Sequence, residues 1–117
     1  MDVYAEGASA MQQMFLLNET LPRRPIVIYG AGNTGLDCFL ELMNRNIRVE
    51  AFCDSNPEKW GILLMNKRVM STEELFANAD KYNVVIASQF YQEINESLKS
   101  HGVKNLYMYR DCWRVDW

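Results

Sequence analysis

The stretch that decides the fold reads Ile26-Val27-Ile28-Tyr29-Gly30-Ala31-Gly32-Asn33-Thr34-Gly35. Its first three residues form an apolar run, which is typical of a strand buried on both faces of a parallel sheet. Glycines follow at the spacing G-x-G-x-x-G, and a helical pattern of apolar residues begins directly after them. Strand, glycine turn and helix in this order are the context that makes the motif informative. The stretch therefore predicts the first unit of an α/β fold.

Each glycine of the motif has its own expected role. Gly30 permits the tight turn, Gly32 lets the backbone approach a pyrophosphate, and Gly35 lets the helix pack closely on the strand. The backbone N–H groups of Asn33, Thr34 and Gly35 would then face an anion, with the positive end of the helix dipole behind them. The alternative is a glycine turn that only packs. We expect the turn to be a nucleotide cradle.

The spacing of apolar residues predicts which faces of the next two elements are buried. The second strand, over residues 48–54, should place Val49, Ala51 and Cys53 on one face. The helix should bury the residues at positions i, i+3, i+4 and i+7, which are Leu36, Phe39, Leu40 and Met43.

An acid stands at the carboxyl end of the second expected strand. Asp54 lies 19 positions after Gly35 (54 − 35). A Rossmann-type site places an acid near this position to accept hydrogen bonds from a ribose. The alternative for Asp54 is a turn-former that caps Asn56-Pro57.

The rest of the chain alternates strand and helix signals. Residues 62–70 predict a small hairpin, or a loop and the third strand. A capping box over residues 71–74 starts a helix, and Gly102 ends the next one. Residues 84–87 and 106–109 are further strands. The pattern predicts an α/β three-layer Rossmann-like sandwich with a mostly parallel five-stranded sheet in the order 3-2-1-4-5.

A loop after the strand at residues 84–87 completes the expected crevice. Carboxyl ends of parallel strands meet at one edge of a sheet, so Ser88 and Gln89 should lie beside the glycine turn and Asp54. We therefore add Ser88 and Gln89 to the predicted cofactor-binding residues.

Both ends of the chain carry apolar patterns outside this unit. Residues 1–25 predict an N-terminal helix and a linker, and residues 26–117 the nucleotide-binding domain. Residues 112–117 alternate apolar and charged residues, as a strand does. The apolar surface of both ends favours self-association, so we expect a homo-oligomer or an exposed apolar patch.

Composition narrows the function classes. The chain has 117 residues, a net charge of −3 and a hydrophobic content of 49%. The negative charge disfavours nucleic acid as the main partner. Three distant cysteines give neither a disulfide framework nor a metal site, and no membrane span is apparent. We expect a soluble, cytoplasmic protein.

Four segments resemble one known family. Residues 28–35, 54–61, 69–75 and 85–88 are together similar to the small Rossmann-like domain of bacterial polysaccharide-biosynthesis proteins. That domain occurs in nucleotide-sugar 4,6-dehydratases with an extra N-terminal domain and in related sugar acetyltransferases. The resemblance covers residues 26 to about 110. One departure is the run Asn66-Lys67-Arg68, where the family usually has glycine before the second strand of the hairpin.

The resemblance implies ligands and contact residues. The domain binds NAD(P) or the nucleotide of a UDP-sugar in that group, and similar folds bind coenzyme A. Carried onto this chain, the resemblance implies ligand contacts at six positions, which are Gly30, Gly32, Asn33, Thr34, Gly35 and Asp54.

Three function hypotheses follow. The first is a nucleotide-binding module associated with sugar-nucleotide or polysaccharide biosynthesis, without catalysis of its own. The second is a small NAD-dependent sugar-nucleotide oxidoreductase or dehydratase. Such enzymes use a Tyr-x-x-x-Lys pair, and none of the six tyrosines has lysine at that spacing. The third is a domain that binds coenzyme A or S-adenosylmethionine.

Overall fold

The computed structural model describes residues 24–109. The expected N-terminal helix and the expected strand at residues 112–117 lie outside these residues. The helical elements are α2 (Asn33–Asn44), the short 3-10 helix η1 (Pro57–Lys59), α3 (Thr72–Ala77) and α4 (Tyr91–Ser100). The strands are β1 (Ile26–Tyr29), β2 (Val49–Cys53), β3 (Leu63–Leu64), β4 (Lys67–Met70), β5 (Asn83–Ile86) and β6 (Leu106–Met108).

The described strands form one sheet in the order β3-β4-β2-β1-β5-β6. β1 pairs in parallel with β2 and β5, while β4 and β6 extend the sheet in parallel on either side. The expected order of five parallel strands is therefore confirmed. The strand count was one too low, because β3 adds a short antiparallel edge strand beside β4.

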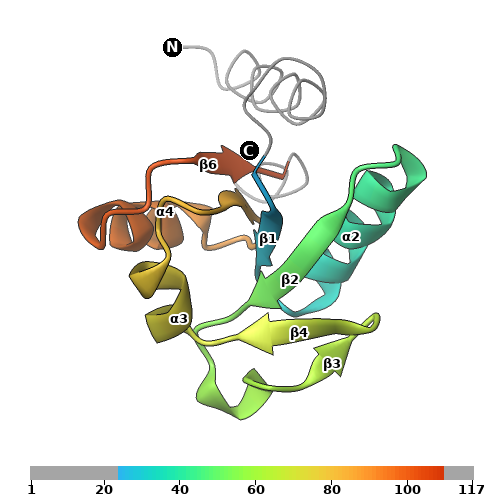
Figure 1. Ribbon diagram of the computed structural model, residues 1–117, viewed down its shortest axis with the longest axis horizontal. Coiled ribbons are helices and arrows are strands. Elements are labelled where there is room, and N and C mark those ends of the chain that lie inside the picture. The colour runs from blue at the N-terminus through green and yellow to red at the C-terminus, as the bar shows by residue number, and fades with distance from the viewer. Residues whose placement is uncertain (1–23, 110–117) are drawn as a thin grey trace.

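Helices cover both faces of this sheet, which gives the expected three layers (Figure 1). Ile28 packs in a cluster with Phe39 of α2, on one face. Val27 packs on the other face, with Leu75 of α3 and Leu98 of α4. All of β1 is buried, as its uninterrupted apolar run predicts.

The buried stripe of α2 lies one residue away from the predicted one. The side chains of Leu40 and Met43 are 47% and 52% exposed, so the prediction that they are buried was wrong. Two small residues, Gly35 and Cys38, are among those buried instead, and they let the helix approach closely. The buried residues of α2 are Gly35, Cys38, Phe39 and Leu42.

The faces of β2 also differ from the prediction. Val49 packs in the α2 cluster, whereas Ala51 and Cys53 pack in the cluster of α3 and α4. The register with β1 shifts at this point, since Ile26 pairs with Val49 but Val27 pairs with Ala51. One extra residue in β2 reverses the alternation, as a β-bulge does.

The turns use residues suited to left-handed backbone. Asn46 follows α2 with φ of 59°. Gly102 follows α4 with φ of 88°, as the sequence predicts for the residue that ends this helix. The hairpin turns at Met65 and Asn66, whose φ values are 50° and 64°. Two positive φ values in a two-residue loop are the geometry of a type I′ turn, formed here without glycine. Within residues 24–109, no helix has the length and apolar character needed to span a membrane.

Candidate functional site

The glycine turn connects β1 to α2, and two of its glycines are required by packing. Gly30 has φ of +123°, and a Cβ there would collide with the carbonyl oxygen of Ala87 at the end of β5. A Cβ on Gly35 would collide with the carbonyl oxygen of Gly30. These contacts fit the roles expected for Gly30 and Gly35, which are the tight turn and the close packing of helix on strand.

Gly32 differs from the other two glycines. It is exposed, and a Cβ added to it would have no heavy atom within 4 Å. Its φ of −109° and ψ of −157° are extended backbone that any residue adopts. Packing within the described chain therefore gives no reason for glycine here. Close approach of a pyrophosphate, the predicted reason, stays a prediction.

The N-terminus of α2 has no cap from its own side chains. Gly32 is the N-cap residue, and the first turn contains no acidic residue. The N–H of Leu36 donates to the carbonyl oxygen of Gly32 at 3.0 Å, which starts the helical bonding. The N–H groups of Asn33, Thr34 and Gly35 come before that bond, and such groups have no acceptor within a helix.

The Asp54 carboxylate bridges the end of β2 and the glycine turn. Its Oδ2 accepts from the N–H of Ala31 at 2.8 Å, and its Oδ1 accepts from the N–H of Asn56 at 2.9 Å. The second bond is the turn-capping arrangement that the sequence left as an alternative. Each carboxylate oxygen keeps a further lone pair. The ribose contact of Asp54 therefore stays a prediction, compatible with its structural role.

Residues after Asp54 fold back over the glycine turn. Trp60 donates its indole N–H to the carbonyl oxygen of Asp54 at 2.6 Å and packs against the α2 cluster. The Nζ of Lys59 donates to the carbonyl oxygen of Ala31 at 3.4 Å and lies 4.0 Å from Oδ2 of Asp54. The sequence shows Lys59 five residues after Asp54, but spacing alone does not bring it to Ala31.

The loop after β5 lies at the same edge of the sheet. The N–H of Ala87 donates to the carbonyl oxygen of Tyr29 at 2.9 Å, which holds the loop beside the start of the glycine turn. Ser88 is half-buried, and its Oγ accepts from the N–H of Phe90 at 3.1 Å. Gln89 is exposed. The structure thus gathers the turn, Asp54 and this loop at the carboxyl ends of neighbouring strands, and ligand contacts by Ser88 and Gln89 remain predictions.

Two buried titratable groups lie directly under the turn. Burial, followed by the nearby Cys53, raises the pKa of Tyr29 to about 12. Burial and the charge of Asp54 raise the pKa of Cys53 to about 12. Both groups are therefore neutral near pH 7. Among residues 24–109, no group of three or more His, Cys, Asp or Glu residues is arranged to hold a metal ion.

This fold and this glycine turn define a Rossmann-like α/β domain. The chain belongs to the family described as C2185-like, N-terminal, which matches residues 23–107. No curated protein matches the sequence.

Two solved structures share the fold. UDP-D-quinovosamine 4-dehydrogenase from Vibrio fischeri is similar with a TM-score of 0.56 and 26% identity, over 74% of this chain and 78% of that chain. RSP, a Rex-family repressor, is similar with a TM-score of 0.59 and 20% identity, over 90% of this chain and 52% of that chain. This chain thus spans about half of the repressor, and at this identity the likeness concerns the fold alone.

Proposed function

We propose that the chain is a nucleotide-binding module that holds NAD(P) or the nucleotide of a UDP-sugar at the glycine turn, in sugar-nucleotide or polysaccharide biosynthesis. The observation that carries the proposal is the contrast among the glycines. Gly30 and Gly35 have packing reasons to be glycine, whereas a Cβ on Gly32 would meet nothing within 4 Å. A ligand backbone that passes over Gly32 supplies the missing reason.

The surroundings of Gly32 support an anionic ligand. The turn leads into a helix of 12 residues whose first turn has neither a side-chain cap nor an acid. A phosphate at this end is stabilised by the N–H groups and by the helix dipole. Asp54 lies one hydrogen bond away, through the N–H of Ala31, and it follows the second parallel strand, where this fold places the acid that binds a ribose.

We propose binding without catalysis, because the chain offers no acid/base pair of the kind sugar-nucleotide enzymes use. The Tyr-x-x-x-Lys spacing is absent from the sequence. His101 follows the last residue of α4, where its ring stacks on Phe76 with centroids 4.0 Å apart. The carboxyl end of α4 points away from the edge where β5 ends, so this imidazole is remote from the glycine turn.

A second candidate is a complete NAD-dependent oxidoreductase or dehydratase. The name of the Vibrio fischeri protein, a 4-dehydrogenase for UDP-D-quinovosamine, favours it and also favours a UDP-sugar as ligand. A third candidate is binding of coenzyme A or S-adenosylmethionine, which the glycine turn also permits.

Thermal unfolding with a panel of ligands tests the proposal. The panel is NAD, NADP, UDP-N-acetylglucosamine, coenzyme A and S-adenosylmethionine, with Gly32→Val as the control that should not respond. A ligand at a hundred times its Kd adds about 2.7 kcal/mol, which raises the midpoint by several degrees in a domain of this size. No rise with any of the five, or an equal rise with Gly32→Val, would contradict the proposal. Turnover of a UDP-hexose with NAD by this chain would favour the enzyme instead.

A further inference from the structure

Lys59 reaches from one loop of the candidate site to the other. It is the last residue of η1, and its Nζ contacts the carbonyl oxygen of Ala31, which lies between the first two glycines of the motif. The same atom is 4.0 Å from Oδ2 of Asp54. The Lys59 side chain is 40% exposed, so a ligand at the turn can reach its ammonium group.

The backbone around Lys59 is fixed by its neighbours. The side chain of Asn56 caps η1 by accepting from the N–H of Glu58 at 3.0 Å, and Pro57 occupies its first turn. The indole of Trp60 donates to the carbonyl oxygen of Asp54 at 2.6 Å. Lys59 lies between these two anchors. Its ammonium group is therefore held beside the glycine turn before a ligand arrives, which reduces the entropy cost of using it.

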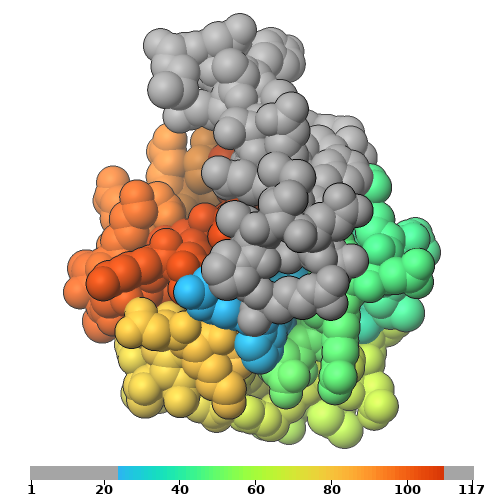
Figure 2. All heavy atoms as spheres, turned by 45° about the horizontal axis from the view of Figure 1, so that its top comes forward, coloured from blue at the N-terminus to red at the C-terminus, as the bar shows by residue number. Residues whose placement is uncertain are grey.

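Other cations of the described chain gather at the opposite edge of the sheet. Four of them lie one or two residues before a parallel strand, and the amino ends of parallel strands lie away from the glycine turn; these are Arg24, Arg48, Lys81 and Lys104. The chain just before β1 reaches the surface, between the green segment of α2 and β2 and the yellow segment of α3 and β5 (Figure 2). Arg68, on β4, is paired with Glu74.

Among the cationic side chains of residues 24–109, Lys59 is thus the one that contacts the glycine turn. We propose that Lys59 is a ligand-binding residue, which pairs with the pyrophosphate of the nucleotide bound there. The inference rests on the proposed function. An ammonium group has three donors, and the bond to Ala31 uses one of them. The remaining donors can bind phosphate oxygens, while Asp54 accepts from the ribose beside them.

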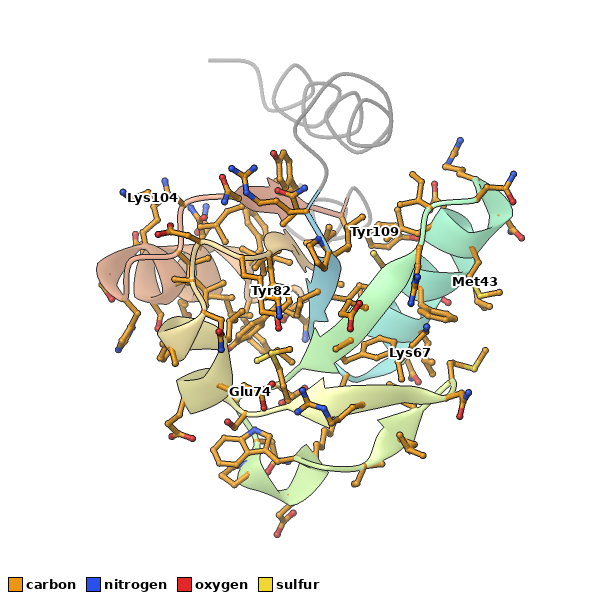
Figure 3. The ribbon with its side chains drawn as sticks, in the orientation of Figure 1. Met43, Lys67, Glu74, Tyr82, Lys104 and Tyr109 are labelled. Atoms are coloured by element: carbon orange, nitrogen blue, oxygen red, sulfur yellow. The ribbon has the colours of Figure 1, made fainter. Side chains whose placement is uncertain are left out.

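Isothermal titration with NAD and with UDP-N-acetylglucosamine, which both contain a pyrophosphate, tests this role. The variants are Lys59→Gln, Lys59→Arg and the matched control Lys104→Gln. Lys104 is exposed and lies on the other side of the molecule from the β3–β4 hairpin (Figure 3). Each titration is repeated at low and at high salt, because an ion pair with phosphate is screened by salt and a packing contact is not.

For the probe that wild type binds, we expect Lys59→Gln to raise Kd on the order of tenfold at low salt, and by much less at high salt. Lys59→Arg should keep most of the affinity, and Lys104→Gln should leave Kd unchanged. An unchanged Kd for Lys59→Gln would overturn the inference while leaving the proposed function intact. So would an equal loss at both salt concentrations, since that marks a purely structural role. Failure of wild type to bind either probe would contradict the proposed function and this inference together.

Discussion

The starts of α2 and α3 are built from the same plan with different residues. Each helix follows the carboxyl end of a parallel strand, β1 for α2 and β4 for α3. Ser71 is the N-cap of α3, and its Oγ accepts from the N–H of Glu74 at 3.1 Å. The first turn of α3 also contains Glu73. At the same positions α2 has Gly32 as N-cap and Gly35 as third residue, with no side-chain cap and no acid.

The difference shows how one local structure serves two purposes. α3 satisfies its N-terminal donors and its dipole with its own side chains, so its start is complete without a ligand. α2 gives up both sources of stability, although a serine at the N-cap would meet no steric obstacle at Gly32. The start of α2 is therefore where we expect an external anion, and five predictions test the comparison.

The largest effect should come from Gly35→Ala. The new Cβ would collide with the backbone carbonyl of Gly30, which has no flexible side chain that could move aside. Overpacking of this kind should lower the free energy of unfolding by about 3 kcal/mol or more. Urea denaturation measures it, with Gly32→Ala as the control that has free space. Equal stability of Gly35→Ala and wild type would show that the turn is not packed as described.

Gly32→Val should have nearly as large an effect, on binding and not on folding. Its branched side chain would stand where the pyrophosphate must approach, while the buried contacts of Phe39 lie behind the turn. We expect a loss of at least a hundredfold in affinity, about 2.7 kcal/mol, with an unchanged circular dichroism spectrum. Calorimetric titration with the ligand found in the thermal panel measures it. Retained affinity would remove Gly32 from the site.

Asp54→Ala should affect both binding and folding. The carboxylate accepts from the N–H groups of Ala31 and Asn56, so its removal leaves two donors without their acceptor. We expect ligand binding weaker by about 1.5–3 kcal/mol, the range for hydrogen bonds to a charged group, together with a lower urea midpoint. If the midpoint falls while the affinity of the folded protein is unchanged, Asp54 acts only as a turn-former.

Ser71→Ala should change stability alone. Loss of an N-cap serine costs about 1 kcal/mol, because the N–H of Glu74 loses its acceptor. Affinity for the nucleotide should be unchanged, since α3 starts at the end of β4 and not at the glycine turn. A drop in affinity for Ser71→Ala would break the distinction between the two helix starts.

Sequence predicted the strand–turn–helix unit and the order of the parallel strands because strong local signals define both. Apolar runs identify β1 and β5, and Gly102 ends α4 through backbone geometry that few residues adopt. The place of Asp54 beside the glycine turn could be predicted from topology, since carboxyl ends of parallel strands meet at one edge.

Features that depend on small shifts or on distant contacts escaped prediction. Periodicity placed Leu40 and Met43 inward because it favours large apolar residues, whereas Gly35 and Cys38 face the sheet. An extra residue in β2 moved Val49 to the other face, and a bulge has no clear apolar signal. The contact between Lys59 and Ala31 joins residues 28 positions apart, which spacing cannot reveal.

The smallest effect concerns the pH dependence of α3. Hydrogen bonds from Arg68 are the main cause that lowers the pKa of the Glu74 carboxyl below its usual value of 4.5. A carboxyl whose pKa is lower in the folded state contributes stability above its unfolded pKa and loses that contribution as the pH falls through the folded pKa. The pair is half exposed, so the contribution should be below about 1 kcal/mol.

Urea midpoints at pH 7 and pH 3 measure this contribution in wild type, Glu74→Gln and Glu73→Gln. Glu74→Gln should be less stable than wild type at pH 7, and the difference should shrink as the pH falls through the lowered pKa of the wild-type carboxyl. Glu73 shares the first turn of α3 but is exposed, so Glu73→Gln should show only the weaker effect of the helix dipole. Equal pH dependence of the two variants would mean that the dipole, and not Arg68, sets the pH dependence of this turn.

The start of α2, with no acid in its first turn, should add nothing to this loss of stability at low pH. A bound phosphate would stabilise the N-terminal N–H groups of α2 by its negative charge. This stabilisation should persist at pH 3, because a pyrophosphate diester keeps its negative charge there.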